Sequence, residues 1–288
     1  MLLSDNPRLN DAAKKFISGL RFEPFVVKGE PVQVISRFTM PFKTVRPAGI
    51  EAFDSARNYF EKGRKVTSPA FSGAKPYELH AAVQINAPSG VIQGEYSDTW
   101  KADKEWKREV RIGPSYFARS RDGEKFYRIM NRANPDLPPA LKSAAAANFT
   151  IAGFVLDAIE PIPPTDDFYE ADWRIRRENV DDVRSIRVLR GNEPPNGGCD
   201  SRNIYAFWFD SAGRLIRFCE RVDVHYSDFK NFNGAQVPQH ISVMEGEKTL
   251  VSIQIDGMRL LDHDIPNNNF DLPSAPSDHS FTTAIEAR

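Results

Sequence analysis

The chain has 288 residues, of which 41% are hydrophobic, 27% charged and 11% aromatic. This composition is ordinary for a globular protein, and the length allows one large β domain or two smaller domains with ample core. The 38 basic and 39 acidic residues leave a formal net charge of −1, so there is no basic excess to displace counterions from phosphates and we expect no nucleic-acid partner. No run of about 18 apolar residues occurs, so no segment is predicted to span a bilayer.

The first forty residues predict a helix followed by a hairpin. A helix is expected over residues 4–20, because Asn6-Pro7 suits its first positions and apolar residues recur at helical spacing. Strands are expected at Arg21–Val27 and Pro31–Phe42 on either side of Lys28-Gly29-Glu30, with apolar residues at alternate positions of the second strand.

This segment resembles the last half of a TonB C-terminal domain. Three pieces carry the resemblance in the order and spacing of that family: Leu9-Asn10-Asp11-Ala12-Ala13, Leu20-Arg21-Phe22-Glu23-Pro24 and Gly29-Glu30-Pro31-Val32. The resemblance implies a module that engages outer-membrane receptors by adding a strand at a sheet edge, with Val32, Val34 and Phe38 on the partner-binding strand. The family's domain begins with further strands and a Tyr-Pro-type motif, which this sequence lacks. We therefore expect Met1 to be an internal start in a longer protein, the alternative being that the fragment docks on the rest of the chain or on a second copy.

Residues 47–76 are expected to form a linker that contains a helix over Ile50–Lys62. A run of short strands at hairpin spacing follows, separated by Gly-, Pro- and Asp-containing turns: Glu78–Ala87, Val91–Trp100, Glu105–Ile112, Ser115–Arg119 and Lys125–Met130. Two helices, Ala140–Ala147 and Phe149–Ile159, are predicted to interrupt this run. Because the second helix is too apolar for a free surface, we expect both to lie against the concave face of the sheet.

After these helices the strand pattern returns. Strands are predicted at six places: Trp173–Arg177, Val183–Leu189, Ile204–Asp210, Arg214–Tyr226, Val237–Met244 and Thr249–Met258. Asp210-Ser211-Ala212-Gly213 predicts a tight hairpin, and the polar residues 274–288 are expected to form a disordered tail. The sum is a mainly β α+β fold of roughly ten antiparallel strands, and a sheet of that size curls on itself and leaves an apolar concavity.

Residues 77–273 resemble the LolA/LolB-like half-barrel of periplasmic lipoprotein carriers. The motifs that carry the resemblance are Gly94-Glu95-Tyr96-x-x-x-Trp100, Trp106-Lys107-Arg108-Glu109, Phe209-Asp210-x-x-Gly213-x-Leu215, Tyr226-Ser227-Asp228-Phe229, Gly234-Ala235-Gln236-Val237-Pro238 and Phe270-x-x-Pro273. The resemblance implies a periplasmic protein that carries a hydrophobic ligand or a lipoprotein and performs no chemistry.

The two cysteines, Cys199 and Cys219, leave two alternatives open. If Asp210 pairs with Arg214, Cys219 faces Tyr205, and an extended chain would place Cys199 roughly 20 Å away. A disulfide therefore requires the chain to turn back before Ser201, which Gly197-Gly198 would allow. Two separate buried thiols are the favoured prediction.

The sequence contains no catalytic, metal or cofactor signature. No pair of the five histidines has metal-ligand spacing, and the Gly-x-Ser-x-Gly, P-loop and dinucleotide motifs are absent. His225-Tyr226-Ser227-Asp228 comes nearest to a catalytic set, but His225 and Tyr226 point to opposite strand faces. Asp262-His263-Asp264 needs no metal, because it suits an exposed acidic turn. We expect no cofactor, no metal and no enzyme activity.

Aromatic residues supply the candidate ligand site. All four tryptophans fall in predicted strands, where they either pack the sheet or line an acyl-sized cavity. The predicted cavity lining is Trp100, Trp106, Phe154, Leu156, Ile159, Trp208 and Phe218.

The leading hypothesis is a cell-envelope protein in which a TonB-like module (residues 1–46) is fused to the half-barrel. Its expected partners are an outer-membrane receptor, a lipoprotein or a lipid acyl chain. A structural domain whose helices fill the concavity and an envelope hydrolase are the alternatives.

Overall fold

The computed structural model describes residues 14–19, 21, 25–32, 53–72, 75–131, 133–165, 172–190, 199, 205–261 and 281–287. The chain divides into two compact units, Met1–Ala52 and Phe53–Arg288. Apart from one short helix, one hairpin and Val32 after it, the features discussed below belong to the second unit.

The described part of the first unit is a short helix and a small hairpin. Residues 14–18 are helical, within the helix predicted over 4–20. The hairpin pairs β1 (Val26–Val27) with β2 (Glu30–Pro31). Its turn residues Lys28 and Gly29 have φ of 56° and 88°, as a two-residue hairpin turn with right-handed strand twist requires. The strands are shorter than predicted, and residues 33–42 of the second lie outside the described residues.

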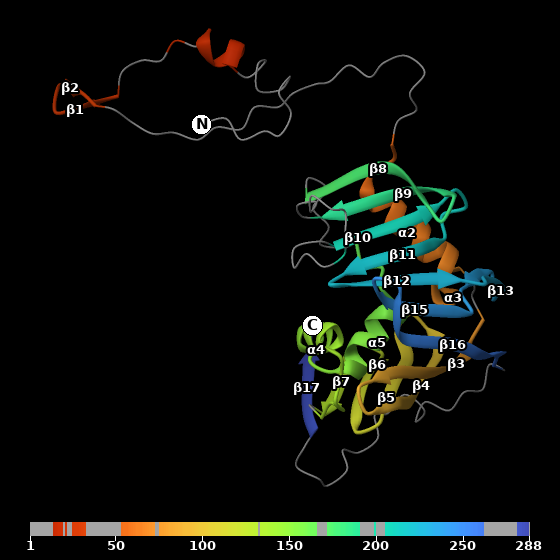
Figure 1. Cartoon of the computed structure of the whole chain (residues 1–288). Helices are drawn as coiled ribbons and strands as arrows, with labels where there is room; N and C mark the ends of the chain where they lie inside the picture. The colour runs from red at the N-terminus through yellow and green to blue at the C-terminus, as the bar shows by residue number, and fades with distance from the viewer. Residues whose placement is uncertain are drawn as a thin grey trace. The chain divides into compact units, whose positions relative to one another are not determined.

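The second unit is built on a 13-stranded antiparallel sheet whose strand order is β17-β7-β6-β5-β4-β3-β16-β15-β12-β11-β10-β9-β8 (Figure 1). Its first-half strands are β3 (Tyr77–Ala87), β4 (Gly90–Ala102), β5 (Glu105–Ile112), β6 (Ser115–Asp122) and β7 (Lys125–Asn131). The strands of its second half are β8 (Trp173–Val180), β9 (Val183–Arg190), β10 (Tyr205–Asp210), β11 (Leu215–Glu220), β12 (Val222–Ser227), β15 (His240–Glu245) and β16 (Lys248–Leu260). The last strand of the chain, β17 (Phe281–Ala287), lies beside β7 at the edge of the first half. The predicted curled, mainly β architecture is confirmed.

Alternation of buried and exposed residues produces these strands. In β3 the residues Leu79, Ala81, Val83 and Ile85 are all buried, and the residues between them are more exposed. Glycines with positive φ close the tight turns at Gly113 and Gly123. The strands predicted between residues 78 and 130 are confirmed to within a few residues at each end.

Two irregularities in the second half differ from the predictions. The predicted strand Arg214–Tyr226 is wrong, because the chain reverses at Arg221 and β11 pairs antiparallel with β12. Arg221 has φ of 64°, a conformation unusual for a bulky residue, so its sequence gives no turn signal. The predicted register of β10 with β11 is also shifted, because a bulge between Trp208 and Phe209 aligns Cys219 with Ala206 in place of Tyr205. A small separate hairpin, β13 (Lys230–Phe232) with β14 (Ala235–Val237), shortens the strand predicted to begin at Val237.

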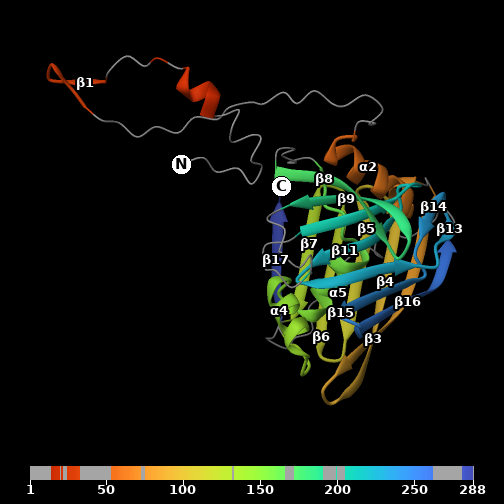
Figure 2. The ribbon, with the colours of Figure 1, turned by 45° about the horizontal axis from the view of Figure 1, so that its top comes forward.

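The helices inserted between β7 and β8 lie inside the curl, as predicted. They are α4 (Pro139–Ala147) and α5 (Ile151–Ile159). Helix α5 begins two residues later than predicted, because Phe149 has φ of 66° and the Thr150 hydroxyl caps the helix by accepting a 2.9 Å hydrogen bond from the Gly153 amide. Seven of the nine α5 residues are buried, and the helix packs on β5 and β6 while the second half of the sheet curls around it (Figure 2).

The helix predicted within a linker is part of the core. Helix α2 spans Ala56–Thr67, is capped by Ser55 and continues into the short α3 (Pro69–Ser72). Phe60 is fully buried, and its ring contacts those of Trp173 and Phe207 edge to face at 4.8 Å. The amphipathic pattern predicted a helix but not the surface that it covers.

The C-terminal tail differs from the disorder predicted for residues 274–288. Residues 281–287 form β17, which pairs antiparallel with β7 along the whole of that strand. The β-branched residues Thr282, Thr283 and Ile285 favour a strand there, and β7 would otherwise offer unpaired backbone groups at a sheet edge. The overall domain boundaries at 46, 76 and 273 stay predictions.

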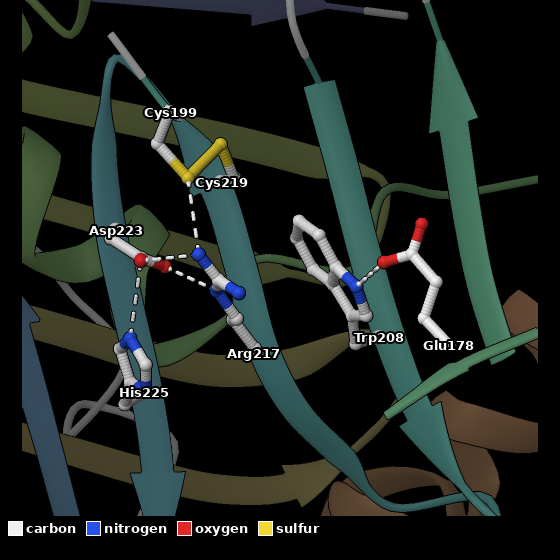
Figure 3. The surroundings of a disulfide bond; sticks show 7 residues. All are labelled: Glu178, Cys199, Trp208, Arg217, Cys219, Asp223 and His225. Carbon is white, nitrogen blue, oxygen red and sulfur yellow. Dashed lines mark hydrogen bonds and ion pairs between the residues drawn. A yellow bond between two sulfur atoms is a disulfide. The ribbon is translucent and has the colours of Figure 1, made fainter. Parts of the chain in front are cut away.

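Cys199 and Cys219 form a disulfide on the outer face of the sheet, with Cα atoms 5.6 Å apart, so the favoured prediction of two separate thiols is wrong (Figure 3). Arg217 lies beside the disulfide, and its guanidinium donates hydrogen bonds of 2.7 and 2.6 Å to both carboxylate oxygens of Asp223.

The same guanidinium stacks over the ring of Trp208 at 4.6 Å, and Arg187 stacks over that ring from the neighbouring strand at 4.9 Å. The indole N–H of Trp208 donates to Glu178 at 2.9 Å (Figure 3). Ion pairs, arginine–tryptophan stacking and the disulfide therefore connect five strands, β8–β12, on the outer face of this half.

Candidate functional site

The concave side of the sheet contains a cavity of about 750 Å³. One wall comes from the middle of the sheet and is apolar, with Leu79, Ile255, Ile241 and Tyr226 from β3, β16, β15 and β12. The opposite wall comes from β4–β7 and mixes aromatic and charged residues. The segments that follow α2 and α5 complete the lining. This volume lies in the range of about 300–1,000 Å³ that is usual for small-molecule sites.

The structure places only part of the predicted cavity lining at this cavity. Trp100, Trp106 and Ile159 line it. Phe154, Leu156 and Phe218 belong to the same buried core but are not lining residues. Trp208 lies in a separate cluster on the outer face, because the regular alternation along β10 directs Phe207 and Phe209 inward. That any of these residues binds a ligand stays a prediction.

The predicted partner-binding strand is described at one position only. Val32 follows β2 and is 40% exposed. Val34 and Phe38 lie outside the described residues.

A buried charged cluster joins the sheet to the end of α5. Arg108 on β5 and Asp98 on β4 are direct cross-strand neighbours, and the Arg108 Nε atom lies 3.3 Å from the Asp98 carboxylate. The other end of the guanidinium lies 2.6 Å from the carboxylate of Glu160, which ends α5. The Tyr77 hydroxyl donates a 2.9 Å hydrogen bond to Asp98. Arg108 therefore forms ion pairs with two carboxylates that come from different elements.

Burial shifts the ionisation of these carboxylates. Removal from water raises the pKa of Glu160 to about 7, although Arg108 opposes the shift by stabilising the charged form. The same cause raises the pKa of Asp98, against Arg108 and the Tyr77 hydrogen bond. The Glu160 side chain is 30% exposed against 4% for Asp98, so Glu160 is the more accessible of the two carboxylates.

Two further contacts fix the C-terminal end of α5. The Arg119 guanidinium on β6 lies 2.9 Å from the Asp157 carboxylate, whose pKa is raised by burial. The Tyr226 hydroxyl on β12 donates a 2.8 Å hydrogen bond to the Ala158 carbonyl. The helix end is thus attached to β5, β6 and β12, which come from both halves of the sheet.

Sequence reasoning missed this cluster, although a signal was present. Asp98 shares the inward face of β4 with Tyr96 and Trp100, two residues to either side. Arg108 likewise shares the inward face of β5 with Trp106 and Val110. A charge at an inward position needs a partner, because an unpaired buried charge is costly. The strand pattern alone could not identify Glu160 as that partner, since it lies on another element.

The arrangement is suited to binding. Among the described lining residues there is no histidine or cysteine, and the carboxylates of Asp98 and Glu160 are both held by Arg108. Within the described ranges, no group of three or more His, Cys, Asp and Glu side chains could hold a metal ion. In that same part of the chain, no single helix is long and apolar enough to cross a membrane. Helices α4 and α5 reach that length and hydropathy only when taken together, and they are bent by 79° relative to each other.

Comparison with solved structures returns bacterial proteins of low sequence identity. A LolA superfamily protein from Nitrosomonas europaea is 15% identical, with a TM-score of 0.44 over 76% of this chain and 99% of that one. A putative outer membrane lipoprotein-sorting protein domain from Vibrio parahaemolyticus is 10% identical, with a TM-score of 0.44 over 74% and 94%. A DUF1329 family protein from Desulfovibrio piger is 13% identical, with a TM-score of 0.44 over 76% and 98%.

No family model matches the sequence, and neither does any curated protein. The resemblance of residues 1–46 to TonB therefore stays a prediction.

Proposed function

We propose that this chain is a non-enzymatic cell-envelope protein that holds an apolar ligand in the cavity of its curled sheet. The ligand is the acyl chain of a lipid or lipoprotein, or an apolar segment of a partner protein. The observation that carries the proposal is the cavity itself: about 750 Å³ remains between the halves of the sheet after α2 and α5 have packed against them. Its wall of Leu79, Ile241 and Ile255 offers an acyl chain the apolar contact that water cannot provide.

The disulfide supports the proposed compartment. Cys199–Cys219 closes a segment with a sequence separation of 20 on the outer face of the sheet. Disulfides persist in oxidising compartments such as the bacterial periplasm and are rare in the cytosol.

The cavity also bears on the main alternative, a structural domain whose helices fill the concavity. Phe60 on α2 and Leu156 on α5 are fully buried, so these helices do fill part of it. They leave the region around Trp100 and Trp106 open. A permanently filled interior would leave no such space.

Native mass spectrometry of the full chain, purified without detergent and then extracted for lipids, tests the proposal. We expect a lipid adduct, or uptake of an added acyl chain by the empty protein. Thr67 on α2 lines the cavity, and Thr67→Trp should reduce uptake by occupying its space. Lys65→Trp adds the same ring at an exposed position of the same helix and should bind like the unmodified protein. Absence of any adduct and any uptake would favour the structural domain.

A second part of the proposal concerns residues 1–46, which would supply a TonB-like strand to an outer-membrane receptor. The observation that favours it is the exposure of the described hairpin, in which Val26, Val27 and Val32 are 40–52% exposed. A photocrosslinking amino acid at Val32 should capture an outer-membrane protein in cells, whereas one at the exposed Lys15 should not. Equal capture from both positions would contradict this part.

A further inference from the structure

The wall formed by β5–β7 carries a row of arginines. Arg108, Arg119 and Arg128 occupy directly paired positions on β5, β6 and β7, and all three line the cavity. Arg121 follows two residues after Arg119 on the same face of β6. Like charges at directly opposed positions repel, so this row is stable only with negative charge nearby.

Carboxylates also lie along this wall. Asp98 and Glu160 engage Arg108, and Asp157 engages Arg119. Asp103 and Glu124 line the cavity as well. Burial raises the pKa of Asp98, Asp157 and Glu160, which favours their neutral forms and leaves the charge of the arginines beside them less balanced.

Arg121 is the arginine with capacity to spare. Among the described residues its partners are the Gly123 carbonyl, 3.2 Å from Nε, and the Glu124 carboxylate, 3.9 Å from Nη2. Glu124 forms its closer ion pair with Lys104. The planar guanidinium of Arg121 therefore keeps N–H groups for a further acceptor, in a side chain that is 36% exposed at the cavity.

The surroundings of Arg121 define what it could hold. Trp106 and Phe126 are its cross-strand neighbours on β5 and β7, and both line the cavity. The wall contributed by β3, β16 and β15 is apolar. A molecule that fills the space would thus meet arginines at one end and hydrocarbon at the other.

We infer that the cavity binds an amphiphile with an anionic head, whose carboxylate or phosphate is held by Arg121 and Arg128 while its acyl chain lies against Leu79, Ile241 and Ile255. This inference rests on the proposed function and adds the chemistry of the ligand's head to it. A guanidinium forms two parallel charge-assisted hydrogen bonds with either anion, so both heads share the same recognition.

The test compares three probes of equal chain length on the full chain, each below its critical micelle concentration: palmitate, palmitoyl lysophosphatidate and monopalmitoylglycerol. At least one anionic probe should bind about tenfold or more tightly than the neutral one, as expected for a hydrogen bond to a charged group. Tighter binding of palmitate identifies a carboxylate head, and tighter binding of lysophosphatidate identifies a phosphate head.

Arg121→Gln should abolish this preference while leaving the affinity for monopalmitoylglycerol unchanged. Arg111→Gln provides the control, because Arg111 lies on the other face of β5 and its side chain is 65% exposed. Should Arg121→Gln fail to fold, Arg121→Lys keeps the charge without the planar fork and should lose part of the preference.

Three results would overturn the inference. Equal binding of all three probes would refute the anionic head and leave the proposed apolar cavity standing. A preference that survives both Arg121→Gln and Arg128→Gln would place the anion elsewhere. Binding of none of the probes would refute the inference together with the acyl-chain form of the proposed function.

Discussion

The two ends of the sheet meet the interior in different ways. At the β8–β11 end, α2 closes the concavity with aromatic contacts, and Phe60 packs against rings from β8 and β10 with no space left between them. At the β4–β7 end, α5 is attached through buried charges, and a cavity remains beside them. Apolar side chains interdigitate and exclude space, whereas arginines and carboxylates hold their elements apart at ion-pair distance. We therefore expect the first end to contribute more to stability, and the second to contain the cavity in which we propose that a ligand binds.

The largest effect should come from the apolar end. Phe60→Ala removes a fully buried ring and leaves a void between α2 and β10, and we expect a loss of about 4 kcal/mol in the free energy of unfolding. Phe71 lies on the adjoining α3 and is 50% exposed, so Phe71→Ala should cost less than about 1 kcal/mol. Chemical denaturation of both variants measures the difference. Equal losses would show that α2 does not close this end.

At the charged end, the loss in the free energy of unfolding caused by removing an arginine should depend on pH. Arg108→Met leaves Asp98 and Glu160 buried without their cation, which should cost about 3 kcal/mol at pH 8. At pH 5, below the pKa of about 7 at Glu160, that carboxyl is protonated, and the raised pKa of Asp98 favours the same change, so the loss should become smaller.

Arg111→Met provides the matched control on the same strand. Its side chain is mostly exposed, and the change should stay within about 0.5 kcal/mol at both pH values. A loss in Arg108→Met that does not vary with pH would mean that packing, and not charge, sets its cost.

The disulfide should stabilise the outer face of the β8–β11 end. Replacing both cysteines by serine removes a cross-link with a sequence separation of 20, for which we expect a loss of about 2–3 kcal/mol. Reduction of the unmodified protein should lower its melting temperature to that of the double variant. An unchanged melting temperature after verified reduction would contradict a stabilising role.

The last effect is a pH dependence set by Glu160. Burial raises its pKa from the ordinary 4.5 to about 7, so the folded protein binds a proton that the unfolded chain has lost. The resulting stability is complete below about pH 4.5 and is lost as pH rises to about 7.

Glu160→Gln cannot ionise and should flatten this part of the pH profile, which melting temperatures between pH 4 and pH 8 would show. Asp98 and Asp157, whose pKa values are also raised, should leave a weaker slope of the same sign. An unmodified protein whose stability rises through this window would contradict the assignment.

The sequence predicted the sheet well where periodicity and turn residues agree. Residues 78–130 show both signals, and their strands are confirmed. The turn at Arg221 and the bulge after Trp208 were missed, because neither position carries a glycine or another turn signal. The disulfide depended on the path of the chain before Tyr205, which the pattern of the strands does not encode.

The candidate site was predictable in part for a related reason. Trp100 and Trp106 lie at inward positions that alternation identifies. The arginines could be seen in the sequence as charged residues at inward-facing positions of the strands. Their side-by-side arrangement and their ion pairs could not be predicted, because these depend on strand pairing and on carboxylates from α5. Trp208 and Phe218 share a face only in a regular register; the extra residue Ile216 in β11 pairs Phe218 with Phe207 and leaves Trp208 on the outer face.

The most direct test of the central claim is a crystal structure of the full chain grown with palmitate. The account predicts an extended acyl chain against Leu79, Ile241 and Ile255, with the carboxylate about 2.8 Å from a guanidinium nitrogen of Arg121 or Arg128. A cavity that holds only water, or one that α2 and α5 have moved to fill, would contradict it.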